Sequence, residues 1–336
     1  MSAVTAEATL WQAVVDDVPV ALSVGGDLVA VAGSEGTCTV FDAATGATVA
    51  SMSVDGGLLD AAFSADGGHL ALCGTAGYRL WHTADQRLDT LAAQGWSARA
   101  RWAGTDRVAV AIGRQVAVHA ADGGLLWRTG PAPSTVTDLT WFRQGREIAV
   151  SAYNGVYRYA RHSTEPVGRF PYPGSHLAIA GTPNGRWICT GNQDRSVHIW
   201  RTRDGNELEM AGYPDKVTRL GFDDTGRWLA NTGAPDVTVW DFAGKGPAGT
   251  SPRMLRGHDA VADLAWRPGT GAVLATAGQE PTAALWQVTR GLPGKPMRPA
   301  HRWELDNPAT TIGWLDQQRL LVATRDGTLR VIDATT

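Results

Sequence analysis

The chain has 336 residues, of which 43% are hydrophobic and 19% are charged, so it can bury a large core. Its formal net charge of −3 gives no overall field that would recruit nucleic acid or an anionic membrane, and neither is expected as a partner. The 40 glycines and the low charge are typical of many short strands joined by tight turns.

The N-terminal segment and the cysteines bear on the compartment. The first residues, MSAVTAEATLW, lack a basic region followed by a continuous apolar run, so we expect no signal peptide. No apolar run approaches the roughly 20 residues of a membrane span. Cys38, Cys73 and Cys189 lie far apart inside apolar runs, which predicts reduced, buried thiols. A cytoplasmic protein is expected, and the 27 arginines against three lysines suggest a bacterial, GC-rich genome.

Internal repeats run through the whole chain. Each repeat has a first strand that ends near an aromatic residue, a turn such as SADGG or TPNGR, and an apolar second strand such as HLALC or RWICT. A third strand and a fourth strand follow. The third strands end at positions spaced by 40, 38, 40, 41, 40, 46 and 46 residues: Phe41, Trp81, His119, Tyr159, Trp200, Trp240, Trp286 and Ile332.

A period of about 40 residues with four short strands per repeat is the signature of a β-propeller. The sequence therefore predicts an all-β fold in which residues 1–336 form one eight-bladed propeller of four-stranded antiparallel blades, with seven blades as the alternative. The last repeat supplies three strands only. We expect residues 8–15, ATLWQAVV, to add its fourth strand and close the ring.

Several repeats resemble WD40 repeats: DRSVHIW, APDVTVWD, the Arg-Gly-His258 sequence and the F-S-x-D-G turn after Phe63. In that family His, Ser or Thr, Asp and Trp form a hydrogen-bonded structural set. The resemblance assigns this role to His258, Thr276 and Trp286 in the seventh repeat, where Glu280 replaces the Asp. In the fifth repeat it assigns the role to Thr190, Asp194 and Trp200, without a matching His.

Two further segments, VFDAATGATV and VHAADGGLLW, are similar to repeats of eight-bladed quinoprotein-like propellers. Those enzymes bind pyrroloquinoline quinone, and some use a vicinal disulfide. This chain has no adjacent cysteines, so the resemblance implies shared architecture and no cofactor.

Polar first-strand residues are expected to face the central channel near the top face of the propeller. Opposite charges alternate among neighbouring repeats, which predicts either ion pairs between blades or a mouth that binds a charged ligand or peptide. Trp96, just before the first strand of the third repeat, is a candidate contact for a partner if it is exposed. The channel-facing positions are Asp60, Arg99, Asp138, Ala178, Arg219, Asp263 and Thr311.

A second candidate surface is formed by two long loops, residues 243–253 and 289–300. Residues 243–303 contain eight basic and three acidic residues. The two loops are either simply solvated or form a basic patch on the bottom face of the propeller, opposite the top face, that binds an acidic protein partner. Its candidate contacts are Lys245, Arg253, Arg290, Lys295 and Arg298.

Motifs for catalysis and metal binding are missing from the sequence. The histidines form no HxH or H-x-x-x-H pattern, G-x-S-x-G does not occur, and GKGPAGTS lacks the order of a phosphate-binding loop. We therefore expect a non-enzymatic, monomeric scaffold without a cofactor that binds a protein or peptide through the top face and channel mouth. The alternative is an enzyme, or a small-molecule or metal binder, that uses polar residues of the channel.

Overall fold

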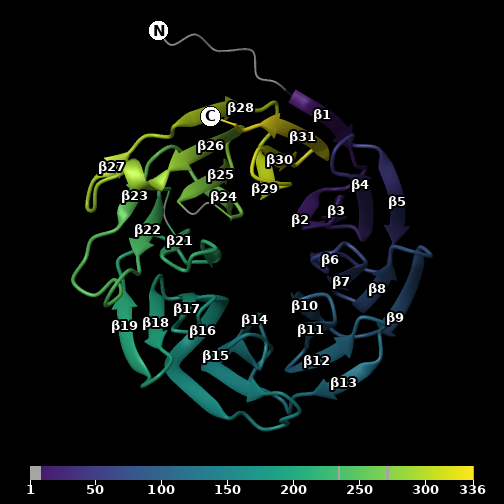
Figure 1. Ribbon diagram of the computed structural model, residues 1–336, viewed down its shortest axis with the longest axis horizontal. Helices are drawn as coiled ribbons and strands as arrows, with labels where there is room; N and C mark the ends of the chain where they lie inside the picture. Colours follow the sequence, from purple (N-terminus) through teal and green to yellow (C-terminus); the bar gives the residue numbers. More distant parts are fainter. Residues whose placement is uncertain (1–8, 234, 270–271, 336) are drawn as a thin grey trace.

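The computed structural model describes residues 9–233, 235–269 and 272–335, and its strands form sheets arranged in a ring (Figure 1). Each sheet points one edge at the centre of the ring and the opposite edge outward. Three consecutive four-stranded sheets begin the ring. They contain β2 (Pro19–Gly25), β3 (Leu28–Gly33), β4 (Thr37–Asp42) and β5 (Thr48–Ser53); β6 (Leu58–Phe63), β7 (His69–Gly74), β8 (Gly77–His82) and β9 (Arg87–Ala92); and β10 (Ser97–Ala103), β11 (Arg107–Ile112), β12 (Gln115–Ala120) and β13 (Leu125–Arg128).

The next two sheets are larger. A six-stranded sheet contains β14 (Asp138–Phe142), β15 (Glu147–Ala160), β16 (Gly168–Gly181), β17 (Trp187–Asn192), β18 (Val197–Arg201) and β19 (Asn206–Met210). A five-stranded sheet contains β20 (Leu220–Phe222), β21 (Trp228–Asn231), β22 (Val237–Asp241), β23 (Arg253–Leu255) and β27 (Pro296–Met297).

Two four-stranded sheets complete the ring. The first contains β24 (Val261–Trp266), β25 (Val273–Gly278), β26 (Thr282–Gln287) and β28 (His301–Glu304), with a 3₁₀ turn, η1 (Val288–Arg290), after β26. The second contains β29 (Ala309–Trp314), β30 (Arg319–Thr324), β31 (Thr328–Asp333) and β1 (Thr9–Val14). The all-β propeller predicted from the sequence is therefore confirmed.

The predicted number of eight separate blades is wrong, because the described strands form seven sheets, the number that the sequence left as the alternative. The difference arises in the fourth and fifth repeats, whose strands share one six-stranded sheet. β15 and β16 are each 14 residues long. β15 pairs with β14 over residues 147–151 and with β16 from Tyr153 onward, and its register with β16 shifts between Tyr153 and Gly155. Asn154 and Gly155 have φ angles of 66° and 139°. β16 in turn pairs with β17.

The N-terminal strand joins the end of the chain to its beginning. β1 pairs antiparallel with β31, with Trp11 opposite Val331 and Val14 opposite Thr328 (Figure 1). Trp11 is buried against Phe41 of the next sheet, with ring centroids 6.2 Å apart, and its indole N–H donates to the Ala43 carbonyl at 3.1 Å. β1 is thus the outermost strand of the last sheet, as expected for residues 8–15. Residue 8 itself lies outside the described residues.

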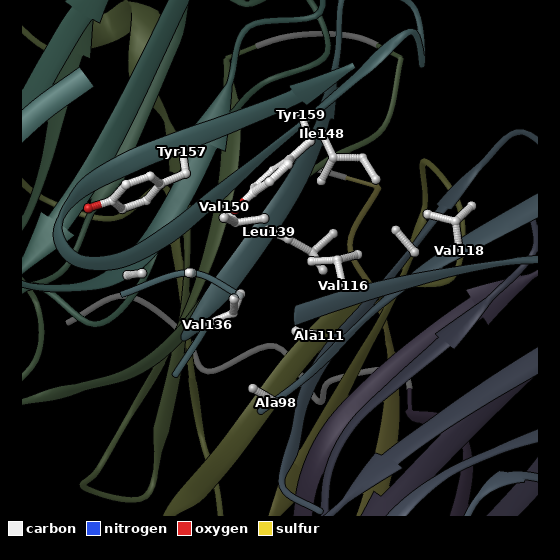
Figure 2. Packing of buried hydrophobic residues seen from close by; sticks show 13 residues of the cluster. Ala98, Ala111, Val116, Val118, Val136, Leu139, Ile148, Val150, Tyr157 and Tyr159 are labelled. Carbon is white, nitrogen blue, oxygen red and sulfur yellow. The ribbon is translucent and has the colours of Figure 1, made fainter. Parts of the chain in front are cut away.

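Apolar side chains fill the space between neighbouring sheets. Figure 2 shows one such layer, in which Ala98, Val116 and Val118 face Leu139, Ile148 and Val150 across the gap between two sheets. Burying each Val, Leu or Ile side chain contributes about 1.5–3 kcal/mol, so these layers hold the sheets in place. Cys38, Cys73 and Cys189 are free and buried, as predicted, and desolvation raises the pKa of Cys38 and of Cys73 to about 12.

Tryptophans at the ends of four first strands tie their sheets to the preceding ones. The indole N–H of Trp102 donates to the Ala62 carbonyl at 2.8 Å, and that of Trp141 to the Arg101 carbonyl at 2.7 Å. Trp266 and Trp314 repeat the contact at 2.9 and 3.0 Å. These bonds fix the innermost strands, which are the strands that form the channel mouth.

Candidate interaction surface

The channel mouth is built from the first strands of the sheets. The seven channel-facing residues predicted from the sequence all line one cavity of about 320 Å³. The structure therefore brings together residues that are spread over more than 250 positions of the chain. They are Asp60, Arg99, Asp138, Ala178, Arg219, Asp263 and Thr311.

Opposite charges in this cavity form pairs between sheets. Arg101, which the sequence analysis missed, lies between two carboxylates: its Nη1 is 2.9 Å from Asp60 Oδ2 and its Nη2 is 3.4 Å from Asp138 Oδ1. Arg99 is farther from Asp138, at 3.8 Å. The alternation in Ala-Arg-Ala-Arg-Trp places both arginines on one face of β10, a signal that would have identified Arg101.

Each of the three aspartates also accepts a hydrogen bond from the neighbouring strand that faces the channel. Asp60 Oδ2 accepts from the Ala100 N–H at 2.9 Å, and Asp138 Oδ2 accepts from the Ile179 N–H at 3.2 Å. Asp263 Oδ2 accepts from the Thr311 hydroxyl at 2.7 Å, while Arg219 Nε lies 3.5 Å from its other oxygen. Because these carboxylates are engaged between sheets, the geometry favours ion pairing between sheets over a general acid or base.

Trp96 lies on the top face, the face formed by the loops between second and third strands and between sheets. Its side chain is 49% exposed and lines a second cavity of about 490 Å³ beside the channel mouth. Leu58, Leu59 and Val136 provide apolar walls, and Thr75, Thr135 and Thr137 provide hydroxyls. Arg99 and Arg219 line this cavity too, and no acidic residue is among the described residues that line it.

The two long basic loops lie on the bottom face, which is formed by the loops between first and second and between third and fourth strands. They are joined to each other through the parallel pairing of β23 and β27. Arg253 helps to hold the two loops together and is not available to a partner. Its guanidinium stacks over Trp228 at 4.4 Å and donates to the Gly291 carbonyl at 2.9 Å. Lys245, Arg290, Lys295 and Arg298 are exposed, and Leu292 beside them is 68% exposed.

The set around His258 forms a continuous buried network. His258 Nε2 lies 2.7 Å from the Thr276 hydroxyl, which also accepts the Trp286 indole N–H at 2.8 Å. His258 Nδ1 lies 2.5 Å from Glu280 Oε1. Although burial opposes ionisation, hydrogen bonds from Thr282 and His258 lower the pKa of Glu280 to about 2. Glu280 therefore completes the set in place of an aspartate.

The corresponding set in the fifth repeat is arranged differently. The resemblance assigned no histidine to this set, yet His176 in β16 lies with its Nδ1 2.9 Å from the Thr190 hydroxyl. Asp194 accepts from Ser196 and Tyr172 at 2.5 and 2.7 Å. The expected link to Trp200 is missing, because its buried indole nitrogen has no hydrogen-bond partner. Neither set reaches the channel mouth.

Metal-ligand clusters and membrane-spanning helices are both missing from residues 9–233, 235–269 and 272–335. This part of the chain contains no group of three or more His, Cys, Asp or Glu side chains placed to hold a metal ion. It also contains no helix of the length and apolar character that crossing a membrane requires.

Comparison with known proteins supports this description. Residues 166–201 match the family described as WD domain, G-beta repeat (WD40). The chain is similar to the ribosome biogenesis protein WDR12 homolog of Drosophila persimilis, with 23% identity over 214 residues that cover 56% of this chain and 49% of that protein. It is also similar to protein tipD of Dictyostelium discoideum, with 23% identity over 163 residues that cover 48% of this chain and 26% of tipD.

Among solved structures, the computationally designed Ika8 protein matches with a TM-score of 0.78 and 17% identity, covering 95% of this chain and 97% of that one. This similarity concerns the fold alone. The chain spans about half the length of the WDR12 relatives it matches. The fold defines the class, a β-propeller, and residues 166–201 of the chain match the model of a WD40 repeat. The match covers the first three strands of the fifth repeat, in which the resemblance assigned a structural role to Thr190, Asp194 and Trp200.

Proposed function

We propose that this chain is a non-enzymatic, cytoplasmic scaffold that binds a protein or peptide at its top face. The observation that supports it best is Trp96, which is half exposed at the rim of a cavity that also contains two arginines. Exposed tryptophans beside well-formed pockets are frequent centres of binding energy in protein interfaces. A rigid ring also presents its loops without a large ordering cost.

The arginines suggest the chemistry of the bound segment. Arg99 and Arg219 lie 3.8 and 3.5 Å from their nearest carboxylates, beyond normal hydrogen-bond distance. Arg99 Nη1 donates to the Leu59 and Ala98 carbonyls at 3.1 and 3.2 Å, so its other N–H groups and those of Arg219 are the donors for an incoming group. Leu58, Leu59 and Val136 offer apolar contact. A segment with an apolar side chain next to a carboxylate fits this cavity.

The exposed basic residues Lys245, Arg290, Lys295 and Arg298 provide a second contact for an acidic region of the same partner. We propose that Arg253 acts there only by holding the loops together. Nucleic acid fits this surface less well, because no exposed aromatic residue is interleaved with these side chains. The WDR12 relatives are named as ribosome biogenesis proteins, and we propose that this chain likewise works within an assembly, as a monomeric subunit.

Affinity purification from the native host tests the proposal with matched variants. Trp96→Ala is compared with Tyr153→Ala, because Tyr153 is 50% exposed but does not line the Trp96 cavity. A partner that is retained by wild type and by Tyr153→Ala, and lost with Trp96→Ala, supports the top face. Charge reversal at Arg290 and Arg298 tests the loops separately. Partners that are still retained by Trp96→Ala and by the charge-reversed loop variant would contradict the proposal.

The channel mouth is the alternative site, since its volume lies in the range of small-ligand sites. A thermal-shift screen of metabolites, repeated with Arg101→Gln, tests this alternative. A ligand that stabilises wild type but not the variant would favour it over the scaffold.

A further inference from the structure

A pair of histidines on the bottom face has no role in the surfaces described above. His69 begins β7 and His82 ends β8, and the two residues are directly opposite each other in the antiparallel pairing. Their Nδ1 atoms are 3.1 Å apart. Their separation of 13 positions corresponds to no metal-binding sequence motif, so only strand pairing reveals that the two rings meet.

The proton positions on this pair are set by Asp89. His82 Nε2 lies 3.0 Å from Asp89 Oδ2, and an ionised carboxylate can only accept a hydrogen bond. His82 therefore carries a proton on Nε2, and in the neutral ring its Nδ1 presents a lone pair toward His69. Arg87 also pairs with Asp89 and holds this carboxylate in place.

The distance between the two nitrogens matches that of two ligands on one metal ion. Imidazole nitrogens bound to a tetrahedral Zn²⁺ at about 2.0–2.1 Å lie about 3.3 Å from each other. The observed 3.1 Å is close to this distance, and each ring must turn so that its Nδ1 lone pair points at the ion and not at the other ring. When the His69 proton moves from Nδ1 to Nε2, both Nδ1 lone pairs become available to the same ion.

The surroundings favour a cation in two further ways. A metal-bound histidine usually donates its other N–H to a carboxylate, and Asp89 is placed to accept that bond from His82. The carboxylates of Asp66 and Asp122 are close enough to act electrostatically on His69. His69 is only partly buried, so water can reach the pair and complete the coordination.

We propose that His69 and His82 form a binding site for a divalent transition-metal ion, with Asp89 as the positioning residue and water as the remaining ligands. Imidazole ligands favour Zn²⁺, Cu²⁺ and Ni²⁺ over Mg²⁺ and Ca²⁺. The His69 ring stacks on Trp102 of the next sheet, with centroids 5.9 Å apart and planes 23° apart. A bound ion would therefore connect β7 and β8 and stiffen their contact with the neighbouring sheet.

Titration of the full chain with ZnCl₂ in a calorimeter and with CuCl₂ by tryptophan fluorescence tests this proposal. Wild type is expected to bind one ion, and Cu²⁺ is expected to quench emission less in Trp102→Phe. His69→Gln and His82→Gln should each weaken binding at least tenfold. Asp89→Ala keeps both ligands and should weaken it about 10–100-fold. His162→Asn, at an exposed histidine elsewhere, should bind as wild type does.

Two results would overturn the proposal: no binding by wild type at millimolar metal, or equal affinity in wild type and His69→Gln. Urea unfolding without metal identifies any variant that has lost its fold. His69 is the safer of the two positions, because its side chain is partly exposed whereas His82 is buried.

Discussion

Thr276 offers a direct test of the buried network around His258. Thr276→Val keeps the shape of the side chain but removes the hydroxyl that binds two groups. The Trp286 indole N–H loses its acceptor at 2.8 Å, and His258 Nε2 loses its partner at 2.7 Å. All three side chains are buried, so water cannot replace the lost bonds without entering the core.

The expected cost follows from the number of groups left without a partner. Each buried polar group that loses its hydrogen bond costs about 1–3 kcal/mol, so the loss of two partners in Thr276→Val should lower the free energy of unfolding by about 2–6 kcal/mol. Thr190 is the matched control. It is equally buried, but its hydroxyl binds only His176, because the Trp200 indole is not attached to it. Thr190→Val should cost about 1–3 kcal/mol.

Urea unfolding followed by tryptophan fluorescence measures both variants on the same scale. The midpoint should fall more in Thr276→Val than in Thr190→Val, with an unchanged slope. An equal loss in the two variants, or a larger loss in Thr190→Val, would refute the assignment of two partners to the Thr276 hydroxyl.

Three other predictions concern stability. The pKa of Glu280 is lower in the folded state than its unfolded value near 4.5, so the ionised Glu280 stabilises the fold above pH 4.5, and this stabilisation is lost as the pH falls toward about 2. In Glu280→Gln the free energy of unfolding should no longer show this dependence on pH between about 4.5 and 2, which acid unfolding measures. Deletion of residues 1–16 removes β1 and exposes the edge of β31, and it should lower the melting temperature of the whole ring; a truncated chain with the full melting temperature would disprove closure by this strand. Arg101→Gln leaves two carboxylates of the channel mouth without their nearest cation and should destabilise more than Arg99→Gln, whose contact with Asp138 is longer; calorimetry can rank the two, and the reverse order would count against the pairing.

The repeating parts of this fold were predictable because local sequence determines them. Aromatic strand ends and turn signals recur about every 40 residues, and they predicted the strands, the ring and the position of the N-terminal segment. The number of sheets was not predicted, because it depends on β16, which pairs with β15 in the fourth repeat and with β17 in the fifth and so links the two repeats. Whether a strand continues across such a boundary leaves little trace in the hydrophobic pattern.

The same distinction applies to the candidate sites. Register along the first strands predicted which side chains gather at the channel mouth, since alternate residues of a strand share a face. It did not predict which arginine lies nearest to Asp60, because that depends on side-chain reach. His176 and the His69–His82 pair were missed because their partners come from strand pairing and not from sequence spacing.

The pairing of β1 with β31 has a consequence for biosynthesis. Thr9 and Arg330 are joined by a 2.8 Å hydrogen bond although 321 positions separate them. During translation, the first strand emerges long before its partner exists, and it must wait with one apolar tryptophan unburied. Contacts between such distant residues form late and slow the overall folding rate. A nascent or prematurely terminated chain would thus expose the edge that the finished ring conceals, and such edges are the part of a β protein most prone to aggregation.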